Sequence, residues 1–180
     1  MAISSNPTIS IGEPAPGFDL PDTDGRRHSL ADSAAATVVV FTCNHCPYAL
    51  AWHDRITAVA RDYGARGVRF IAINSNDATR YPRDALEAMR ERVQHEDWPL
   101  PYLHDEGQEV AHAYGAKVTP DIFVLDGEGR LRYRGAPDSD YADQSQNAAW
   151  LRAALDAVLA GADPQPSETE PVGCSIKWKA

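Results

Sequence analysis

Residues 38–48 read Val-Val-Val-Phe-Thr-Cys-Asn-His-Cys-Pro-Tyr, a β-branched run that leads directly into a Cys-x-x-Cys motif. The apolar residues that follow are spaced three and four apart, as on one face of a helix: Ala49, Trp52, Ile56, Val59 and Tyr63. Pro47 fits the first turn of that helix, where a missing N–H costs least. The pattern predicts a strand, then Cys43 at the mouth of a helix and Cys46 one turn inside it.

The predicted position of Cys43 makes it the candidate nucleophile. Free N–H groups and the positive end of the helix dipole stabilise a thiolate, and redox cysteines in such places have pKa values of roughly 3.5–7.5 instead of about 8.5. We therefore predict that Cys43 is largely ionised at neutral pH and that Cys46 stays protonated. Cys43 would attack a disulfide, and Cys46 would then attack the mixed disulfide and release the product.

His45, between the two cysteines, has two interpretations. When protonated, it places a positive charge beside the thiolate and favours the reduced form, which makes the pair a better oxidant. Alternatively, it is a solvent-facing side chain that only caps the loop. The first interpretation gives His45 a tuning role, and the sequence leaves both open.

The order strand, Cys-x-x-Cys, helix resembles the thioredoxin superfamily. Three further segments are similar to its peroxiredoxin-like branch, the alkyl hydroperoxide reductase/thiol-specific antioxidant (AhpC/TSA) family: Phe-Asp-Leu-Pro-Asp at 18–22, Tyr-Arg-Gly at 133–135 and Gly-Cys-Ser-Ile-Lys-Trp at 173–178. The similarity spans roughly residues 10–180. It implies a thioredoxin-like α/β fold, in which a mixed central β-sheet is flanked by helices on both faces and extended by an N-terminal β-hairpin.

Thr119 and Pro120 stand just before the apolar run Ile-Phe-Val-Leu, and a proline at a strand entrance cannot donate to the sheet. In the thioredoxin superfamily a cis-proline at this point faces the cysteine pair, so the resemblance implies a cis bond between Thr119 and Pro120. Such a bond lets the preceding backbone bind a substrate strand. Thr119 and Pro120 are therefore candidate docking residues. So is Thr42, which replaces the tryptophan that thioredoxins have before the first cysteine.

The chain divides into one domain and two terminal segments. We expect the domain to comprise residues 13–161. Residues 1–12 are expected to form a flexible N-terminal arm, and residues 162–180 a Pro-rich linker and tail that carries Cys174. The tail regains apolar alternation after the linker, so it can fold back onto the domain. Cys174 is then either a third redox thiol near the pair or part of a purely structural anchor.

The remaining patterns predict the elements around the motif. Two short β-rich stretches flank Thr-Asp-Gly at 23–25, which indicates the N-terminal hairpin. Residues 68–73 predict a buried strand that runs parallel to 37–41. Pro82 is expected to open the next helix.

Composition and charge limit the partners. The formal net charge of −9 argues against nucleic acid and against anionic membrane surfaces. Three cysteines are too few for a secreted disulfide scaffold, and the first twelve residues lack the basic and apolar regions of a signal peptide. We therefore expect a cytoplasmic protein without a cofactor. Its expected partner is a disulfide-bearing protein or a low-molecular-weight thiol or disulfide, and the sequence does not identify the reductant.

Three functions compete for this motif. Thiol–disulfide exchange by Cys43 and Cys46 is the one that the spacing favours. The second is a thiol peroxidase, in which peroxide oxidises a cysteine to sulfenic acid. Peroxiredoxins have a threonine three residues before that cysteine, which Thr42 does not match, and a later arginine that holds the thiolate, for which Arg134 is the candidate.

The third function is a metal-binding module. Copper or zinc would bind to Cys43, His45, Cys46 and either Cys174 or a distant histidine. The second ligand pair of a structural zinc site is missing, and copper-delivery proteins of this fold have three residues between their cysteines, so no metal is expected. Residues 37–41 also lack the buried carboxylate of thioredoxins. Proton transfer must therefore come from elsewhere, with His45 or water as candidates.

Overall fold

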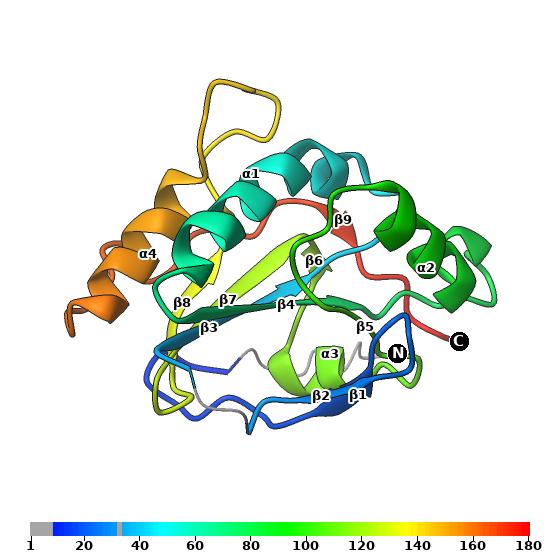
Figure 1. The fold of residues 1–180 in the computed structure, drawn as a ribbon, viewed down its shortest axis with the longest axis horizontal. Coiled ribbons are helices and arrows are strands. Elements are labelled where there is room, and N and C mark those ends of the chain that lie inside the picture. Colours follow the sequence, from blue (N-terminus) through cyan, green and yellow to red (C-terminus); the bar gives the residue numbers. More distant parts are fainter. Residues whose placement is uncertain (1–8, 32–33) are drawn as a thin grey trace.

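A computed structural model describes residues 9–31 and 34–180, and Figure 1 shows the sheet with helices on both sides of it. The elements in chain order are β1 (Asp19–Pro21), β2 (Arg27–Ser29), β3 (Ala36–Phe41), α1 (Pro47–Gly64), β4 (Val68–Asn74), the 3₁₀ helix η1 (Pro82–Asp84), α2 (Leu86–His95), β5 (Tyr102–His104), α3 (Glu109–Tyr114), β6 (Val118–Thr119), β7 (Asp121–Asp126), β8 (Leu131–Gly135), α4 (Ala149–Leu159) and β9 (Cys174–Ser175). Residues 1–8 of the expected flexible arm lie outside the described residues.

The central strand of the five-stranded sheet is β3, and the strand order is β5-β4-β3-β7-β8. Val38 of β3 lies opposite Phe70 of the parallel strand β4 and opposite Val124 of the antiparallel strand β7. The sheet is therefore mixed, and the predicted parallel pairing of 37–41 with 68–73 is confirmed. The antiparallel strands β1 and β2 form the predicted N-terminal hairpin.

Both faces of β3 are buried, which explains its unbroken β-branched run. Val38 and Val40 belong to the core that the sheet makes with α1, α4 and Met89 of α2. Val39 and Phe41 point to the other face, where α3, Ile176 of the tail and residues of the N-terminal hairpin cover the sheet. This arrangement, with helices on both faces of a mixed sheet, confirms the predicted fold class.

Helix α1 begins later than the sequence predicted. It starts at Pro47, and Cys46 is its N-cap residue with an extended backbone (φ −77°, ψ 123°). The ring of a proline disfavours helical geometry in the residue before it. Cys46 therefore does not lie one turn inside the helix, as the sequence predicted. The prediction that Cys43 sits at the helix mouth is therefore wrong, because Cys43 lies in the loop between β3 and the N-cap.

Pro82 has a similar effect further along the chain. It opens the short helix η1, and Ala85 is extended (φ −68°, ψ 156°) before α2 begins at Leu86. The single helix expected from Pro82 onward is thus two elements, and η1 carries the buried Asp84. In the part of the chain that the structure describes, no helix combines the length and the apolar character needed to cross a bilayer.

The segment predicted as a linker follows the edge of the sheet. The backbone N–H of Arg134 donates to Ser167 (3.1 Å), and that of Thr169 donates to the carbonyl of Arg134 (3.0 Å). Gly135 makes room for this contact, since a Cβ there would lie 2.0 Å from the Thr169 hydroxyl oxygen. The chain is therefore already attached to the domain before it reaches β9.

Asp138, just after β8, joins α1 to α4. Its carboxylate accepts hydrogen bonds from the Trp52 indole (2.8 Å), from the Arg55 guanidinium (2.8 Å) and from the backbone N–H of Ala148 (3.0 Å). Asp138 is 2% exposed and Arg55 is 7% exposed. One buried carboxylate thus fixes two helices of the same layer.

We predict that Asp138→Ala lowers the free energy of unfolding by about 3–5 kcal/mol, because it leaves the Arg55 charge buried and unpaired. The matched control is Asp97→Ala, which breaks the surface pair of Arg61 and Asp97 and should cost at most about 1 kcal/mol. Urea unfolding of both variants measures the difference. Equal midpoints for the two variants would show that Asp138 has no special role.

Candidate active site

The two cysteines of the motif meet at Thr119. Cys43 Sγ lies 3.4 Å from the Thr119 hydroxyl, and the Cys46 thiol donates to the Thr119 carbonyl at 3.2 Å. The peptide bond between Thr119 and Pro120 is cis, as the resemblance implied. Cys43 is 1% exposed and Cys46 is 0% exposed. The structure therefore brings Cys43, Cys46, Thr119 and Pro120 together in a buried site.

The two thiols differ in acidity because they share a hydrogen bond. The bond from the Cys43 thiol to the Cys46 sulfur lowers the pKa of Cys46 to about 4, and the Ala49 backbone N–H adds to this effect. The same bond, together with burial, raises the pKa of Cys43 well above its ordinary value. The Thr119 carbonyl accepts a hydrogen bond from the Cys46 thiol and so favours protonated Cys46. The Cys43 thiol and the Ala49 N–H both favour the Cys46 thiolate, and together they outweigh this contact. These contacts favour the negative charge on Cys46 over Cys43.

This order is the reverse of the one predicted from the sequence. Cys46 is the N-cap residue of α1, where the positive end of the helix dipole favours its thiolate, and its side chain makes no cap hydrogen bond. Cys43 lies instead beside the carboxylate of Asp84, whose negative charge raises the pKa of Cys43 further. The expectation of an ionised Cys43 depended on a helix start that the structure does not have.

Asp84 is the buried carboxylate that the sequence did not reveal. It is 0% exposed and accepts hydrogen bonds from the Asn44 backbone N–H (2.7 Å) and from the side-chain amides of Asn74 (3.1 Å) and Asn76 (3.0 Å). The polar stretch at 74–77 was visible in the sequence as a loop after a strand. Nothing in the spacing showed that η1 would bring an acid against it.

His45 faces this carboxylate. Its Nδ1 lies 2.5 Å from Asp84 Oδ2, and its ring stacks parallel to that of Tyr81 at a centroid distance of 5.8 Å. The alternative in which His45 only caps the loop toward solvent does not fit this inward contact. The pair of His45 and Asp84 thus places an imidazole and a carboxylate close to Cys43, whereas β3 itself has no carboxylate.

A metal ion has three candidate ligands here. The ligand atoms of Cys43, His45 and Asp84 all lie within 4.8 Å of one another. Each of the three already has a partner in the site, and Cys43 is also half of the cysteine pair. Formation of a disulfide would remove its sulfur as a metal ligand, so a bound ion and a working disulfide exclude each other.

Two other predicted residues have different surroundings. Arg134 Nη2 donates to Asp121 Oδ2 at 3.0 Å, and Asp121 is 0% exposed directly after Pro120. Arg134 thus neutralises Asp121, which is not the predicted thiolate-stabilising role. The Thr42 backbone N–H donates to Ile73 (2.9 Å), which extends the pairing of β3 with β4 up to the motif.

Cys174 is brought to the pair. Strand β9 pairs antiparallel with β6, so that Cys174 lies opposite Thr119. Its side chain packs against the cluster of Cys43, Cys46 and Ala49, and it lies close enough to Cys46 for that thiol to affect its pKa. Unlike the pair, Cys174 is partly exposed. All three cysteines of the chain therefore meet at one residue, Thr119.

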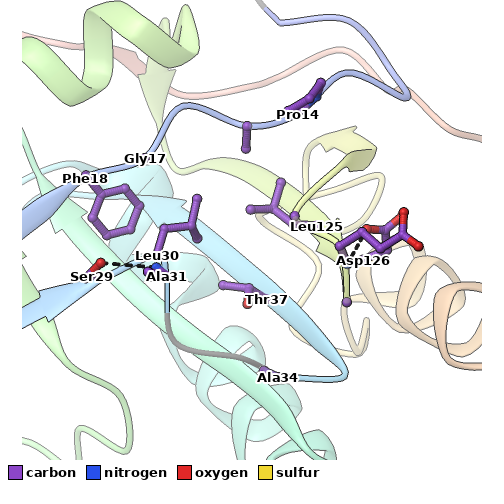
Figure 2. Close-up of a pocket in the computed structure, with 14 residues that line it drawn as sticks. Pro14, Gly17, Phe18, Ser29, Leu30, Ala31, Ala34, Thr37, Leu125 and Asp126 are labelled. Atoms are coloured by element: carbon purple, nitrogen blue, oxygen red, sulfur yellow. Dashed lines mark hydrogen bonds between the residues drawn. The ribbon is translucent and has the colours of Figure 1, made fainter.

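A cavity of about 550 Å³ lies elsewhere in the molecule, and Figure 2 shows Phe18, Leu30, Thr37 and Leu125 among its lining residues. Thr37 stands at the start of β3, whereas the cysteines follow the end of that strand. Most of the length of the central strand thus separates this cavity from the sulfur atoms. It has no part in the chemistry of the cysteines.

Comparisons with known proteins found a family and several proteins that this chain resembles. The sequence model of the AhpC/TSA family matches residues 11–134. The crystal structure of an uncharacterized conserved protein from Geobacillus kaustophilus is 42% identical, with a TM-score of 0.90 over 94% of this chain and 93% of that chain. A hypothetical protein from Sinorhizobium meliloti 1021 is 39% identical, with a TM-score of 0.91 over 97% of both chains. The thiol-disulfide oxidoreductase ResA of Geobacillus thermodenitrificans is 26% identical over 69% of this chain and 68% of that protein.

We predict that Cys43→Ala raises the pKa of Cys46 by about 1–2, because a hydrogen bond to a charged group contributes roughly 1.5–3 kcal/mol. Cys43→Ser is the matched control, since its hydroxyl still donates and should keep the pKa of Cys46 low. Alkylation of the Cys46 peptide against pH, followed by mass spectrometry, measures both. The same pKa in the two variants would contradict a hydrogen bond between the two sulfurs.

Proposed function

The chain belongs to the AhpC/TSA family, and we propose that within this family it is a thiol–disulfide oxidoreductase that works through Cys43 and Cys46. The observation that carries the proposal is the pair of hydrogen-bonded thiols at Thr119, one of which has a low pKa. The relatives named thiol-disulfide oxidoreductase support the same activity. The substrate is a disulfide, carried by a protein or by a low-molecular-weight compound.

We assign a separate step to each of the two sulfurs. The Cys46 thiolate attacks one sulfur of a disulfide, which forms a mixed disulfide and expels a thiolate that takes up a proton. The Cys43 thiol, hydrogen-bonded to Cys46, then loses its proton and attacks the Cys46 sulfur. This step closes the disulfide between Cys43 and Cys46 and releases the second thiol of the substrate. Two electrons have moved from the pair to the substrate.

His45 and Asp84 are placed to accept the proton that leaves Cys43. Asp84 is close enough to Cys43 for its charge to affect the thiol, and His45 links this buried carboxylate to the partly exposed edge of the site. A disulfide forms only after Cys43 is deprotonated, so a nearby acceptor speeds the second step. We assign this role to the pair of His45 and Asp84.

The peroxidase alternative has less support. A peroxidatic cysteine needs a cation at its thiolate, and the candidate Arg134 is paired with Asp121. The cysteine pair is also buried among sulfur and hydroxyl groups, with a second thiol already in contact.

A cytoplasmic location remains a prediction from the sequence.

We predict that the reduced protein is oxidised faster by a low-molecular-weight mixed disulfide than by hydrogen peroxide at equal concentration, because its thiols are arranged for exchange. Stopped-flow measurement of thiol loss compares the two oxidants. Faster reaction with peroxide, together with sulfenic acid on either cysteine, would instead identify a peroxidase.

In steady-state reduction of a disulfide, Cys43→Ser and Cys46→Ser should each lower turnover by more than about a hundredfold, since each removes one partner of a two-step reaction. Ser175→Ala is the control, because it changes an exposed side chain on β9 and leaves all sulfur atoms in place. Turnover in either cysteine variant close to that of the unmodified protein would rule out the pair as the redox centre.

A further inference from the structure

The buried cysteine pair has no direct route to a large partner. Cys43 and Cys46 are 1% and 0% exposed, whereas Cys174 is partly exposed. We propose that Cys174 is a third catalytic thiol, which passes disulfide exchange between protein partners at the surface and the buried pair. This relay rests on the proposed function and adds to it the residue that a protein disulfide meets first.

The pairing of β9 with β6 sets the position of Cys174. Cys174 lies opposite Thr119, the residue whose hydroxyl contacts Cys43 and whose carbonyl contacts Cys46. Figure 1 shows β9 beside β6, next to the loop that leads into α1. A segment 128 positions after Cys46 in the sequence (174 − 46 = 128) thus enters the site as an extra strand. The strand occupies the edge at which the backbone of a partner would otherwise pair.

Gly173 makes this close approach possible. A Cβ at position 173 would lie 2.1 Å from the carbonyl oxygen and 2.7 Å from the carbonyl carbon of Thr119. These are backbone atoms next to the cis bond, so they cannot move aside as a flexible side chain can. Any larger residue at 173 must therefore displace the tail from the site.

The residues after Cys174 hold the tail in place. Ile176 is 3% exposed and packs in the core under the sheet. The Lys177 backbone donates to Asn76 (2.9 Å), and its carbonyl accepts hydrogen bonds from the Asp77 backbone (2.8 Å) and the Gln108 side chain (2.8 Å). The tail is thus fixed on the C-terminal side of Cys174, and exchange at its sulfur does not require the tail to leave.

The relay consists of three exchanges in which bonds and protons balance. Cys174 loses its proton and attacks a partner disulfide, which forms a mixed disulfide and releases a first partner thiol that takes up the proton. The Cys46 thiolate attacks the Cys174 sulfur and expels the second partner thiolate. Cys43 then attacks the Cys46 sulfur, and its proton passes to the released Cys174. The partner gains two electrons, and the pair of Cys43 and Cys46 ends as a disulfide.

The contact between Cys46 and Cys174 directs the second exchange. Burial and the hydrogen bond with Cys46 raise the pKa of Cys174 to about 11. In a mixed disulfide on Cys174, the Cys174 sulfur is the one that packs against Cys46, and the partner's sulfur lies beyond it. Attack by Cys46 therefore falls on the Cys174 sulfur, which is the one it contacts.

The test compares Cys174→Ser with the unmodified protein in the reduction of insulin, a protein disulfide, with dithiothreitol as reductant. We expect turnover to fall at least about tenfold, because the serine cannot form the first mixed disulfide. Gly173→Ala, which keeps all three thiols but displaces the tail, should fall similarly, while Ser175→Ala should not change. Unchanged turnover in both Cys174→Ser and Gly173→Ala would overturn the relay.

A second measurement traps the intermediate. Mild oxidation of Cys43→Ser should accumulate a disulfide between Cys46 and Cys174, identified by peptide mapping, because the last exchange is blocked. Absence of this disulfide would overturn the relay even if turnover had fallen. Failure of the proposed function is distinguishable, since the unmodified protein would then not form the disulfide between Cys43 and Cys46 at all.

Discussion

Thr119 is the residue on which the arrangement of the site depends. Its hydroxyl meets Cys43, its carbonyl meets Cys46, and its backbone pairs with Cys174. Three segments that are far apart in the sequence therefore converge on one peptide unit. Because β7 begins directly after Pro120 and pairs with β3, the strand that delivers the cysteines also fixes Thr119 in front of them. The sheet therefore sets the position of Thr119 relative to the cysteine motif.

Buried carboxylates hold the elements around this point. Asp84 binds the loop of the motif through the Asn44 backbone, and Asp121 binds Arg134 across the hairpin of β7 and β8. Asp138 joins α1 to α4 in the same layer. Each of these charges has cationic or N–H partners, as burial requires. These buried carboxylates thus connect elements of the fold through hydrogen bonds. One of them, Asp84, lies close enough to Cys43 to raise the pKa of its thiol.

Local patterns in the sequence were sufficient for much of this structure. The β-branched run before Cys43 predicted the central strand, and the hairpin followed from its turn residues. The cis bond between Thr119 and Pro120 was implied by the resemblance to the thioredoxin superfamily and not by a local pattern. The helix start was mispredicted although Pro47 held the information, because a proline makes the preceding Cys46 extended. The sequence predicted Cys43 as the nucleophile, whereas our proposal assigns the first attack to Cys46.

Other features depend on tertiary contacts that no local pattern encodes. Asp84 lies close to Cys43 because η1 packs against the residues at the ends of β3 and β4. Arg134 pairs with Asp121 because the hairpin of β7 and β8 places the two side chains together. The pairing of β6 with β9 involves two residues on each side, too few to leave a periodic signal. The tail of the sequence left a position near the pair open for Cys174, and the packed sheet shows that Cys174 lies opposite Thr119.

The central claim is that Cys43 and Cys46 form a reversible disulfide. Equilibration of the protein with glutathione buffers of increasing oxidised fraction, followed by mass spectrometry of the two peptides, tests it most directly. The account predicts one reversible two-electron transition in which both thiols disappear together and a Cys43–Cys46 linked peptide appears. Independent oxidation of the two cysteines, or irreversible conversion of either one to a sulfinic acid, would contradict it.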